Sequence, residues 1–332
     1  MYRIKTFNKI SPVGLNKFDP EHYAVSDSET NEDGILVRSA KLLDYEFPNS
    51  LLAIARAGVG VNNIPIDRCS QAGIAVFSTP GANANAVKEL VLCAMLMGSR
   101  DVSGAIDWVR DQVASGVDVT TVVEKGKSAF VGPELYKKSL GVIGLGAIGS
   151  LVANIALSMG MDVYGYDPYL SVDAALRLDR HVHVVKDVNE LYKVADYVTI
   201  HVPYNNDTKD FINAEAISKM KDGVVCIDNA RGELVDIDAI TEAVESGKFG
   251  ALFMDAFPGE TGIIHVPHDE DIIRTPGMPY LKLKYLRSFV NVYHTPHMAF
   301  FTEEAAEQMA ECGVNSIYEI LTEGKSRHEI PC

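Results

Sequence analysis

The sequence of 332 residues is poor in cysteine, and its cysteines are scattered. There are five, with no CxxC pair and no Cys/His spacing that suits a zinc site: Cys69, Cys93, Cys226, Cys312 and Cys332. An odd, dispersed set does not form the disulfide framework of a small secreted protein. The N-terminal residues also lack the apolar core of a secretory signal, so we expect a cytoplasmic protein.

Long apolar runs and an excess of basic residues are lacking as well. The most apolar stretch, around Leu90–Met97, is far shorter than the roughly 20 residues of a membrane span, so we expect no membrane insertion. Lys and Arg number 30 against 45 Asp and Glu, a formal net charge of -15. Nucleic acids and anionic membrane surfaces recruit clustered basic residues, so this balance argues against both as partners. An anionic substrate would also be repelled unless positive groups gather locally.

Hydrophobic residues make up 47% of the chain, enough for the cores of about two domains. Short β-rich runs alternate with helical patterns, which is typical of an α/β fold with parallel sheets. We predict four strands in the first hundred residues, at 2–7, 34–38, 53–57 and 74–77. Seven more are predicted at 140–144, 162–166, 183–185, 197–201, 224–228, 251–255 and 289–293. The clearest helical patterns cover 83–99, 147–159, 236–246 and 302–321, and the segment 261–287 is expected to be a long loop.

The strongest motif is the run G-L-G-A-I-G at residues 144–149, which follows a predicted strand and opens a helix. Gly144 permits a tight turn, Gly146 lets the backbone approach a pyrophosphate, and Gly149 allows close contact between helix and strand. The helix N-terminus adds unpaired N–H donors for phosphates. The predicted cofactor contacts therefore include the motif residues Gly144, Gly146, Ala147, Ile148 and Gly149.

An acidic residue, Asp167, ends the next predicted strand, 18 residues after Gly149. A carboxylate at this position accepts hydrogen bonds from the adenosine ribose and repels a 2′-phosphate. This context disfavours a mere glycine-rich turn and predicts NAD rather than NADP as cofactor.

Three further polar residues follow predicted strands, where a doubly wound sheet binds its ligand: Arg231, Glu260 and His297. Taken singly, each has an ordinary explanation as a surface arginine, a solvated loop acid or a histidine in a turn. Together they resemble the D-isomer-specific 2-hydroxyacid dehydrogenases, and the resemblance covers nearly the whole chain. Arg231 lies in an Arg-Gly turn, Glu260 comes shortly after a strand end, and His297 follows Thr-Pro.

The resemblance implies the fold, an α/β arrangement of two Rossmann-like or flavodoxin-like domains with doubly wound parallel sheets. Residues 1–100 and 298–332 would form the substrate-binding domain, into which the NAD-binding domain of residues 101–297 is inserted. It also implies the chemistry, in which His297 is the general acid/base, Glu260 orients it, and Arg231 binds the substrate carboxylate. The nicotinamide supplies the redox step.

The first domain carries its own resemblance to this family. Val59 and Gly60 lie in a segment similar to the loop whose backbone N–H groups hold the substrate carboxylate. Arg38, Ser39 and Arg56 lie in segments similar to those of D-3-phosphoglycerate dehydrogenases whose arginines contact the substrate phosphate. This implies oxidation of D-3-phosphoglycerate to 3-phosphohydroxypyruvate, as in serine biosynthesis, although surface ion pairing is the alternative role of the two arginines.

The resemblance implies further contacts and a partner. His201, Val202 and Pro203 would line the adenine pocket, and Thr208 would reach a phosphate. The nicotinamide would be flanked by Asn229, Ala230 and Asp255, while His294 would be structural. A homodimer is expected through the cofactor domain, with Trp108 and residues 101–127 as the interface.

Two features keep other functions open. Thr261 follows Glu260 where the family commonly has proline, and residues 261–287 with Phe300 and Phe301 resemble D-lactate dehydrogenases. D-lactate or another 2-oxo acid therefore remains an alternative substrate, and an NAD(H)-sensing corepressor remains an alternative that is not an enzyme. The residues His265, His268 and 269–271 fit no common metal-ligand spacing, so we expect no metal.

Overall fold

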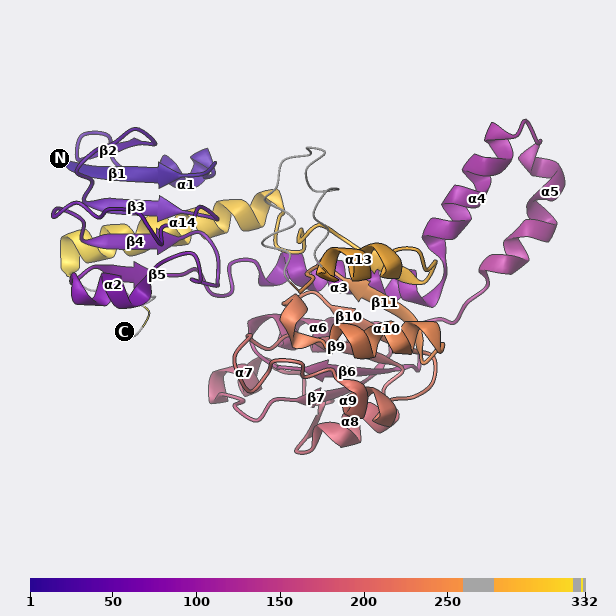
Figure 1. The fold of residues 1–332 in the computed structure, drawn as a ribbon. Helices are drawn as coiled ribbons and strands as arrows, with labels where there is room; N and C mark the ends of the chain where they lie inside the picture. The colour runs from indigo at the N-terminus through magenta and orange to yellow at the C-terminus, as the bar shows by residue number, and fades with distance from the viewer. Residues whose placement is uncertain (259–277, 325–329, 331–332) are drawn as a thin grey trace. The chain divides into compact units, whose positions relative to one another are not determined.

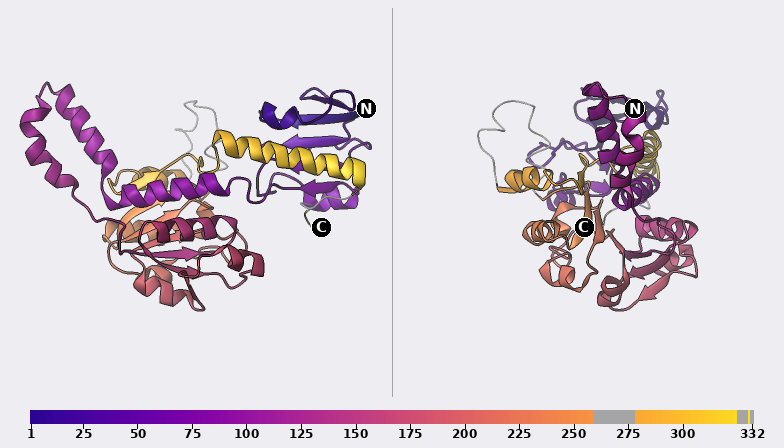
Figure 2. Two further views of the ribbon diagram at one scale, coloured as in Figure 1. Left: turned by 180° about the vertical axis from the view of Figure 1, so that it is seen from behind. Right: turned by 90° about the vertical axis from the view of Figure 1, so that its right-hand side faces the viewer.

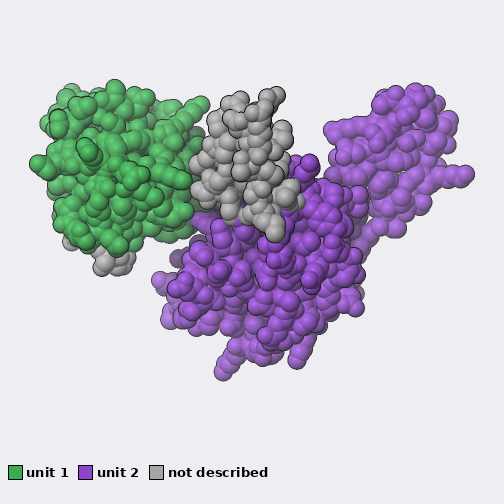
Figure 3. Space-filling view, in the orientation of Figure 1, with its two compact units in different colours: residues 1–86, 300–332 green, residues 87–299 purple. Residues whose placement is uncertain are grey.

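The computed structural model describes residues 1–258, 278–324 and 330 of the chain (Figure 1). It divides into two compact units, Met1–Ala86 with Phe300–Cys332, and Val87–Ala299 (Figure 3). Both are α/β, with one parallel sheet each, as expected from the alternation of strands and helices. None of the described helices is long and apolar enough to cross a membrane.

Unit 1 (residues 1–86 and 300–332) is built on five parallel strands in the order β2-β1-β3-β4-β5. They are β1 (Tyr2–Phe7), β2 (Tyr23–Ser26), β3 (Gly34–Val37), β4 (Ala53–Arg56) and β5 (Ala75–Phe77). This is the flavodoxin-like order, which reverses between β1 and β3. Four of these strands were predicted; β2 was missed, because it is a short edge strand in which only Tyr23 is buried.

Helices cover both faces of this sheet. They are α1 (Pro12–Leu15), α2 (Ile66–Gln71) and α14 (Glu303–Glu323), the long helix drawn in yellow in Figures 1 and 2. Met309, Val314 and Ile317 of α14 are buried in one apolar cluster with Ile4 and Leu36 of the sheet. The C-terminal helix therefore belongs to the core of the N-terminal strands, which makes unit 1 discontinuous in sequence.

Unit 2 (residues 87–299) contains seven parallel strands in the order β12-β11-β10-β9-β6-β7-β8. Their bounds are β6 (Ser139–Ile143), β7 (Asp162–Tyr166), β8 (His183–Val185), β9 (Tyr197–Ile200), β10 (Val224–Asp228), β11 (Phe249–Met254) and β12 (Val292–His294). The chain winds outward from β6 in both directions, as in a Rossmann sheet, and the order reverses between β6 and β9. The seven predicted strands are confirmed, although β12 begins three residues later than expected.

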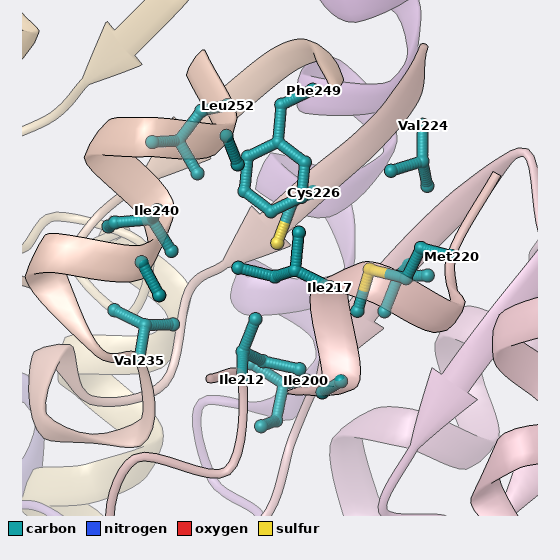
Figure 4. Close-up of a cluster of buried hydrophobic side chains, with 14 of the residues drawn as sticks. Ile200, Ile212, Ile217, Met220, Val224, Cys226, Val235, Ile240, Phe249 and Leu252 are labelled. Atoms are coloured by element: carbon teal, nitrogen blue, oxygen red, sulfur yellow. The ribbon is translucent and has the colours of Figure 1, made fainter. Parts of the chain in front are cut away.

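One face of this sheet buries the apolar cluster shown in Figure 4. Four helices supply it, each with buried side chains in the cluster: α8 (Val188–Val194), α9 (Ala214–Lys219), α10 (Ile237–Glu245) and α13 (Met278–Leu286). The other described helices of the unit are α3 (Ala84–Ser99), α4 (Val102–Ala114), α5 (Val119–Gly126), α6 (Ala147–Ser158) and α7 (Val172–Arg177). Short 3-10 turns lie at Lys127–Phe130 and Gly232–Leu234.

Two expectations differ from the structure. The segment 261–287 is not wholly a loop, because α13 occupies its C-terminal part and buries Leu283 and Leu286 in the cluster of Figure 4. We also expected the first domain to end at residue 100, whereas unit 2 begins at Val87. The reason is that α3 packs on the second sheet, where the Ser99 hydroxyl lies 2.7 Å from the Tyr197 hydroxyl.

Candidate active site

The glycine-rich loop after β6 has the geometry that its three glycines predict. Gly144 has a φ of +90° and lies so close to the next strand end that a Cβ there would be 2.8 Å from the His201 carbonyl. A Cβ on Gly149 would lie 1.8 Å from the Gly144 oxygen, so any side chain would push helix α6 off the loop. A Cβ on Gly146 would meet nothing within 4 Å, which leaves open space where a pyrophosphate would approach.

Helix α6 also differs from its neighbours at its N-terminus. Among the described helices of unit 2, six others begin at a side chain that accepts a first-turn N–H: Asp101, Asp118, Ser171, Asp187, Asn213 and Asp236. The N-cap of α6 is Gly146, and no described side chain caps it. The first-turn amides around Ala147 and Ile148 therefore suit an anion, which the positive end of the helix dipole also favours.

Asp167 lies at the end of β7, beside this loop. One carboxylate oxygen accepts the Leu145 N–H at 2.9 Å and the other accepts the Tyr169 N–H at 2.9 Å. A carboxylate accepts about four hydrogen bonds, so capacity for two ribose hydroxyls remains. The half-buried side chain thus holds the loop in place and still fits the adenosine end of NAD.

The end of β9 carries His201, which the sequence assigns to the adenine pocket. Its Nε2 lies 3.0 Å from the Thr199 hydroxyl, and its Nδ1 finds no partner among the described residues. Burial lowers the pKa of His201 to about 3, so the imidazole is neutral at physiological pH.

The loop after His201 is closed by its own hydrogen bonds. The Thr208 hydroxyl donates to the Pro203 carbonyl at 2.6 Å and accepts the Asn205 N–H at 2.8 Å. Its hydrogen is therefore used inside the loop, and contact of Thr208 with a phosphate stays a prediction. Val202 packs against the cluster of Figure 4, whereas Pro203 is exposed.

The end of β10 buries two polar side chains. Asp228 is fully buried; one of its oxygens accepts the N–H groups of Ala230 and Arg231 at 3.0 and 3.3 Å, and the other has no partner among the described residues. Burial raises the pKa of this carboxyl to about 7. Asn229 is 7% exposed, and neither atom of its amide finds a described partner.

Buried polar atoms without a hydrogen-bond partner cost free energy. A ligand that both donates and accepts hydrogen bonds would supply the missing partners. The nicotinamide carboxamide has this chemistry, and contact of Asn229 with it stays a prediction. Asp228 was not among the predicted site residues; the signal for it was a carboxylate ending the apolar run V-V-C-I-D of β10.

Arg231 follows this turn on an extended backbone, at the edge of the parallel sheet where the strands end. Its side chain is half-buried and donates to the neighbouring Ala230 carbonyl at 2.7 Å. It forms no ion pair with any described residue, which leaves guanidinium donors for a substrate carboxylate.

The ends of β11 and β12 carry Asp255 and His297. Asp255 is 1% exposed and bonds the segment that follows β12, where His297 is half-buried with a left-handed φ of +52°. His294 lies on β12 with its ring edge-on to Phe257, at a centroid distance of 6.3 Å, which supports a structural role. Glu260 lies outside the described residues, as do His265, His268 and residues 269–271.

The predicted substrate residues of unit 1 gather at the ends of β3 and β4. Val37 and Arg56 are register partners, so Arg38 and Arg56 leave the sheet at the same edge. The Arg56 Nε donates to the Arg38 carbonyl at 3.0 Å, and the Arg38 guanidinium lies 5.2 Å from the centre of the Phe301 ring. Two arginines that the sequence places 18 residues apart are therefore neighbours.

Backbone hydrogen bonds fix the loops around this pair. The Gly58 N–H donates to the buried Thr79 hydroxyl at 2.9 Å, at the start of the loop that contains Val59 and Gly60. The Ser39 N–H donates to the Asn8 side chain at 2.9 Å, between the ends of β1 and β3. The order of the sheet reverses at these two strands, which is where such folds bind ligands.

Comparison with known proteins gives a consistent result. The model of the family "D-isomer specific 2-hydroxyacid dehydrogenase, NAD binding domain" matches residues 92–299. Hydroxypyruvate reductase of Thermotoga maritima is 36% identical over 297 residues, which are 88% of this chain and 84% of that protein. D-3-phosphoglycerate dehydrogenase of Synechocystis is 33% identical over 292 residues, 87% of this chain. This chain spans about half of that relative, 47% of its length.

Among solved structures, D-lactate dehydrogenase of Aquifex aeolicus, complexed with NAD and lactic acid, has a TM-score of 0.72 with this chain. The two are 28% identical, and the match covers 97% of this chain and 96% of the other. The similarity therefore extends over both units of the chain.

The raised pKa of Asp228 predicts a pH-dependent stability. Between about pH 4 and 7 the folded protein keeps a proton that the unfolded chain, with an ordinary value of 3.8, has released. The free energy of unfolding should therefore fall as the pH rises through this range. Asp228→Asn cannot ionise but can still accept both N–H groups. We expect it to match the native protein near pH 4 and to be more stable by a few kcal/mol above pH 7.

Urea unfolding from pH 4 to 8 measures this difference. His201 acts in the opposite sense, because its lowered pKa removes stability as the pH falls below about 6.5. It is present in both proteins, so its contribution cancels in the comparison. A difference between the two proteins that is constant with pH would show that Asp228 stays ionised.

Proposed function

Because the chain belongs to the D-isomer-specific 2-hydroxyacid dehydrogenases, an NAD-dependent family of oxidoreductases, we propose that it interconverts a D-2-hydroxy acid and its 2-oxo acid. One observation supports this most directly: the glycine loop, Arg231 and His297 all follow strands of one parallel sheet. The carboxyl ends of such strands share an edge, so cofactor-binding and proton-transferring groups have a common location.

Arg231, His297 and Glu260 would each have a separate role in the reaction. Arg231 would bind the substrate carboxylate through two guanidinium donors and orient the carbon that loses hydride. His297 would take the hydroxyl proton during oxidation and return it during reduction, since a ring nitrogen of imidazole can both accept and donate a proton. Glu260 would orient the imidazole, as the family resemblance implies. The nicotinamide of the bound cofactor accepts or supplies the hydride.

We propose D-3-phosphoglycerate as the substrate, oxidised to 3-phosphohydroxypyruvate. The support is the pair Arg38 and Arg56 at one sheet edge of unit 1, since a phosphate dianion is best bound by planar, charged donors. The Arg38 guanidinium lies over the Phe301 ring, 5.2 Å from its centre, and donates no hydrogen bond to a described residue. Phe301 is 54% exposed, so an apolar substrate side chain is the competing possibility.

The substrate is tested by the ratio of kcat/KM for 3-phosphohydroxypyruvate to that for pyruvate. We expect a ratio well above one, falling about 10- to 100-fold in Arg38→Gln, because a charge-assisted hydrogen bond contributes about 1.5–3 kcal/mol. The control is Lys17→Gln, which removes the same charge from a surface ion pair with Glu311 in unit 1. A native preference for pyruvate, or an equal loss for both acids in Arg38→Gln, would favour a D-lactate-type enzyme.

The role of His297 is tested by His297→Asn, since asparagine tolerates the left-handed backbone of this position. We expect kcat to fall about 10²- to 10⁴-fold, the usual contribution of general acid–base catalysis, with the Kd for NADH within twofold. NADH fluorescence titration measures the affinity, and the exposed His181→Asn is the matched control. Loss of NADH binding would place His297 in the cofactor site instead.

We also propose a homodimer that forms through the hairpin of α4 and α5 (Figures 1 and 2). Neither helix has a buried residue. Val102, Ile106, Val109 and Val113 recur every three or four residues along α4 and are 41–61% exposed. An unpaired apolar stripe of this kind favours association. The Trp108 ring packs against that of Phe130, with 6.1 Å between the ring centroids.

Sedimentation velocity tests this assembly. We expect the native protein to sediment as a dimer and Ile106→Glu with Val113→Glu as a monomer, because two charges would be buried in the interface. Asp111→Lys, an exposed position on α4 half a turn from the stripe, should remain a dimer. A native monomer, or a dimeric double variant, would contradict the proposal.

A further inference from the structure

The connection from β2 to β3 crosses the unit 1 sheet without a helix. These two strands lie on either side of β1, so the chain has to pass over that strand. A crossover between parallel strands usually takes roughly a dozen residues or more and contains a helix. Here it is the segment 27–33, which contains no helix. Part of β1 is therefore left without the cover that a crossover helix gives.

A cavity of about 250 Å³ lies beside this connection. Its lining includes Lys5 of β1, Glu32 of the connection, and Tyr45, Glu46 and Phe47, which follow β3. All of these residues belong to unit 1. Pockets for drug-sized ligands measure about 300–1,000 Å³, so this cavity suits a smaller molecule.

Glu32 places a buried carboxylate in the wall of the cavity. The residue is 1% exposed, and one of its carboxylate oxygens accepts the Tyr45 hydroxyl at 2.7 Å. Burial and the neighbouring Glu32 raise the pKa of Tyr45, so the phenol keeps its proton and donates. The second oxygen of Glu32 has no hydrogen-bond partner among the described residues. A buried carboxylate in this state favours a ligand that brings a donor, above all a charged one.

Lys5 places the opposite charge in the same cavity. Its ammonium donates to the Glu29 carbonyl at 2.7 Å and lies 5.7 Å and 5.8 Å from the ring centres of Phe7 and Tyr45. These contacts hold the ammonium in place but use only one of its three hydrogens in a hydrogen bond. Among the described residues Lys5 forms no ion pair, with Glu32 or with any other carboxylate. Both charges therefore remain available to a ligand.

The two charges together select the kind of ligand. Lys5 would repel a simple cation and Glu32 would repel a simple anion, whereas a molecule that carries both an ammonium and a carboxylate satisfies both groups. Glu46, which is exposed, adds a second carboxylate and so favours the ammonium end. The rings of Tyr45 and Phe47 offer apolar surface for the rest of the molecule.

We propose that this cavity binds an apolar α-amino acid, with the ammonium on Glu32, the carboxylate on Lys5 and the side chain against Tyr45 and Phe47. Glu32 precedes β3, whereas Arg38 follows it, so the amino-acid site and the proposed phosphate site lie at opposite ends of this strand. The site thus goes beyond the proposed function and does not depend on it.

Calorimetric titration of the native protein without cofactor tests the ligand class. Leucine is the probe, 4-methylpentanoate is the same molecule without the ammonium, and 3-methylbutylamine is the same molecule without the carboxylate. We expect leucine to bind with a Kd below about 1 mM. Each analogue should bind at least about tenfold more weakly, because it loses one charge-assisted hydrogen bond. No binding of leucine at about 10 mM, or an analogue that binds as tightly, would overturn the proposal.

Substitutions locate the binding site. Glu32→Gln and Lys5→Met should each weaken leucine binding about 10- to 100-fold. The matched controls are Asp33→Asn and Arg3→Met, which remove neighbouring charges that lie 3.9 Å from each other and do not line the cavity. Both controls should bind leucine within twofold of the native protein. Unchanged affinity in Glu32→Gln and Lys5→Met, or an equal loss in the controls, would contradict the assignment.

Hydrogen exchange on the native protein gives a location that needs no variant. Saturating leucine should slow exchange at least about twofold at the amides of residues 45–47, because a bound ligand stabilises the segment that it contacts. Exchange in 183–185, the edge strand β8 of unit 2, is the internal reference and should not change. Slowing confined to unit 2 would place leucine elsewhere and overturn the proposal. The rates of 2-oxo acid reduction do not enter this test, so it stands apart from the proposed function.

Discussion

Parallel pairing of strands is the constraint on which the rest of this structure depends. Every strand of both sheets is parallel to its neighbours, so each sheet has one edge at which all its strands end. Segments far apart in sequence are brought together there by the pairing of the strands that they follow. The glycine loop, the Arg231 turn and the His297 segment follow β6, β10 and β12 of one sheet for this reason. Arg38 and Arg56 meet in the same way in the other sheet.

Polar groups buried at these strand ends are the second shared feature. Asp228, Asn229 and Asp255 are all less than 10% exposed, which costs free energy unless hydrogen bonds compensate. Asp255 is compensated within the fold, by the segment after β12. Asn229 and one oxygen of Asp228 are not compensated by described residues. The fold thus contains one buried carboxylate whose hydrogen bonds are made within the protein, and buried polar atoms that find no partner among the described residues.

Local concentration of positive charge reconciles the acidity of the chain with an anionic substrate. The formal net charge is -15, yet the groups proposed to bind the ligands are guanidinium side chains and the N-terminus of α6, which no described side chain caps. Charges separated by more than about 8–10 Å are largely screened at physiological salt, so these near groups outweigh the distant acids. The overall negative charge then favours solubility and weakens binding to nucleic acid.

The sequence by itself determined those features that depend on a few consecutive residues. The strands β1, β7 and β10 have the predicted bounds, and the glycine loop has the predicted conformation. Alternation or short runs of apolar residues and the freedom of glycine are local properties. Short strands and helices were harder to predict from the sequence. The strand β2 is an edge with one buried side chain, and α13 is stabilised by two leucines packing on a distant cluster in a segment otherwise rich in proline and acids.

Only the tertiary structure decided what the polar residues at the strand ends do. The burial of Asp228 depends on the elements packed around its strand, so its raised pKa could not be read from its neighbours in sequence. The partners of Asp255 lie about 40 residues away, beyond any local pattern. The left-handed backbone of His297, with a φ of +52°, lies within the segment that Asp255 binds. Hydrogen-bond partners and burial are properties of the assembled sheet, which is why the sequence indicated Asp255 and His297 but not their arrangement, and did not indicate Asp228.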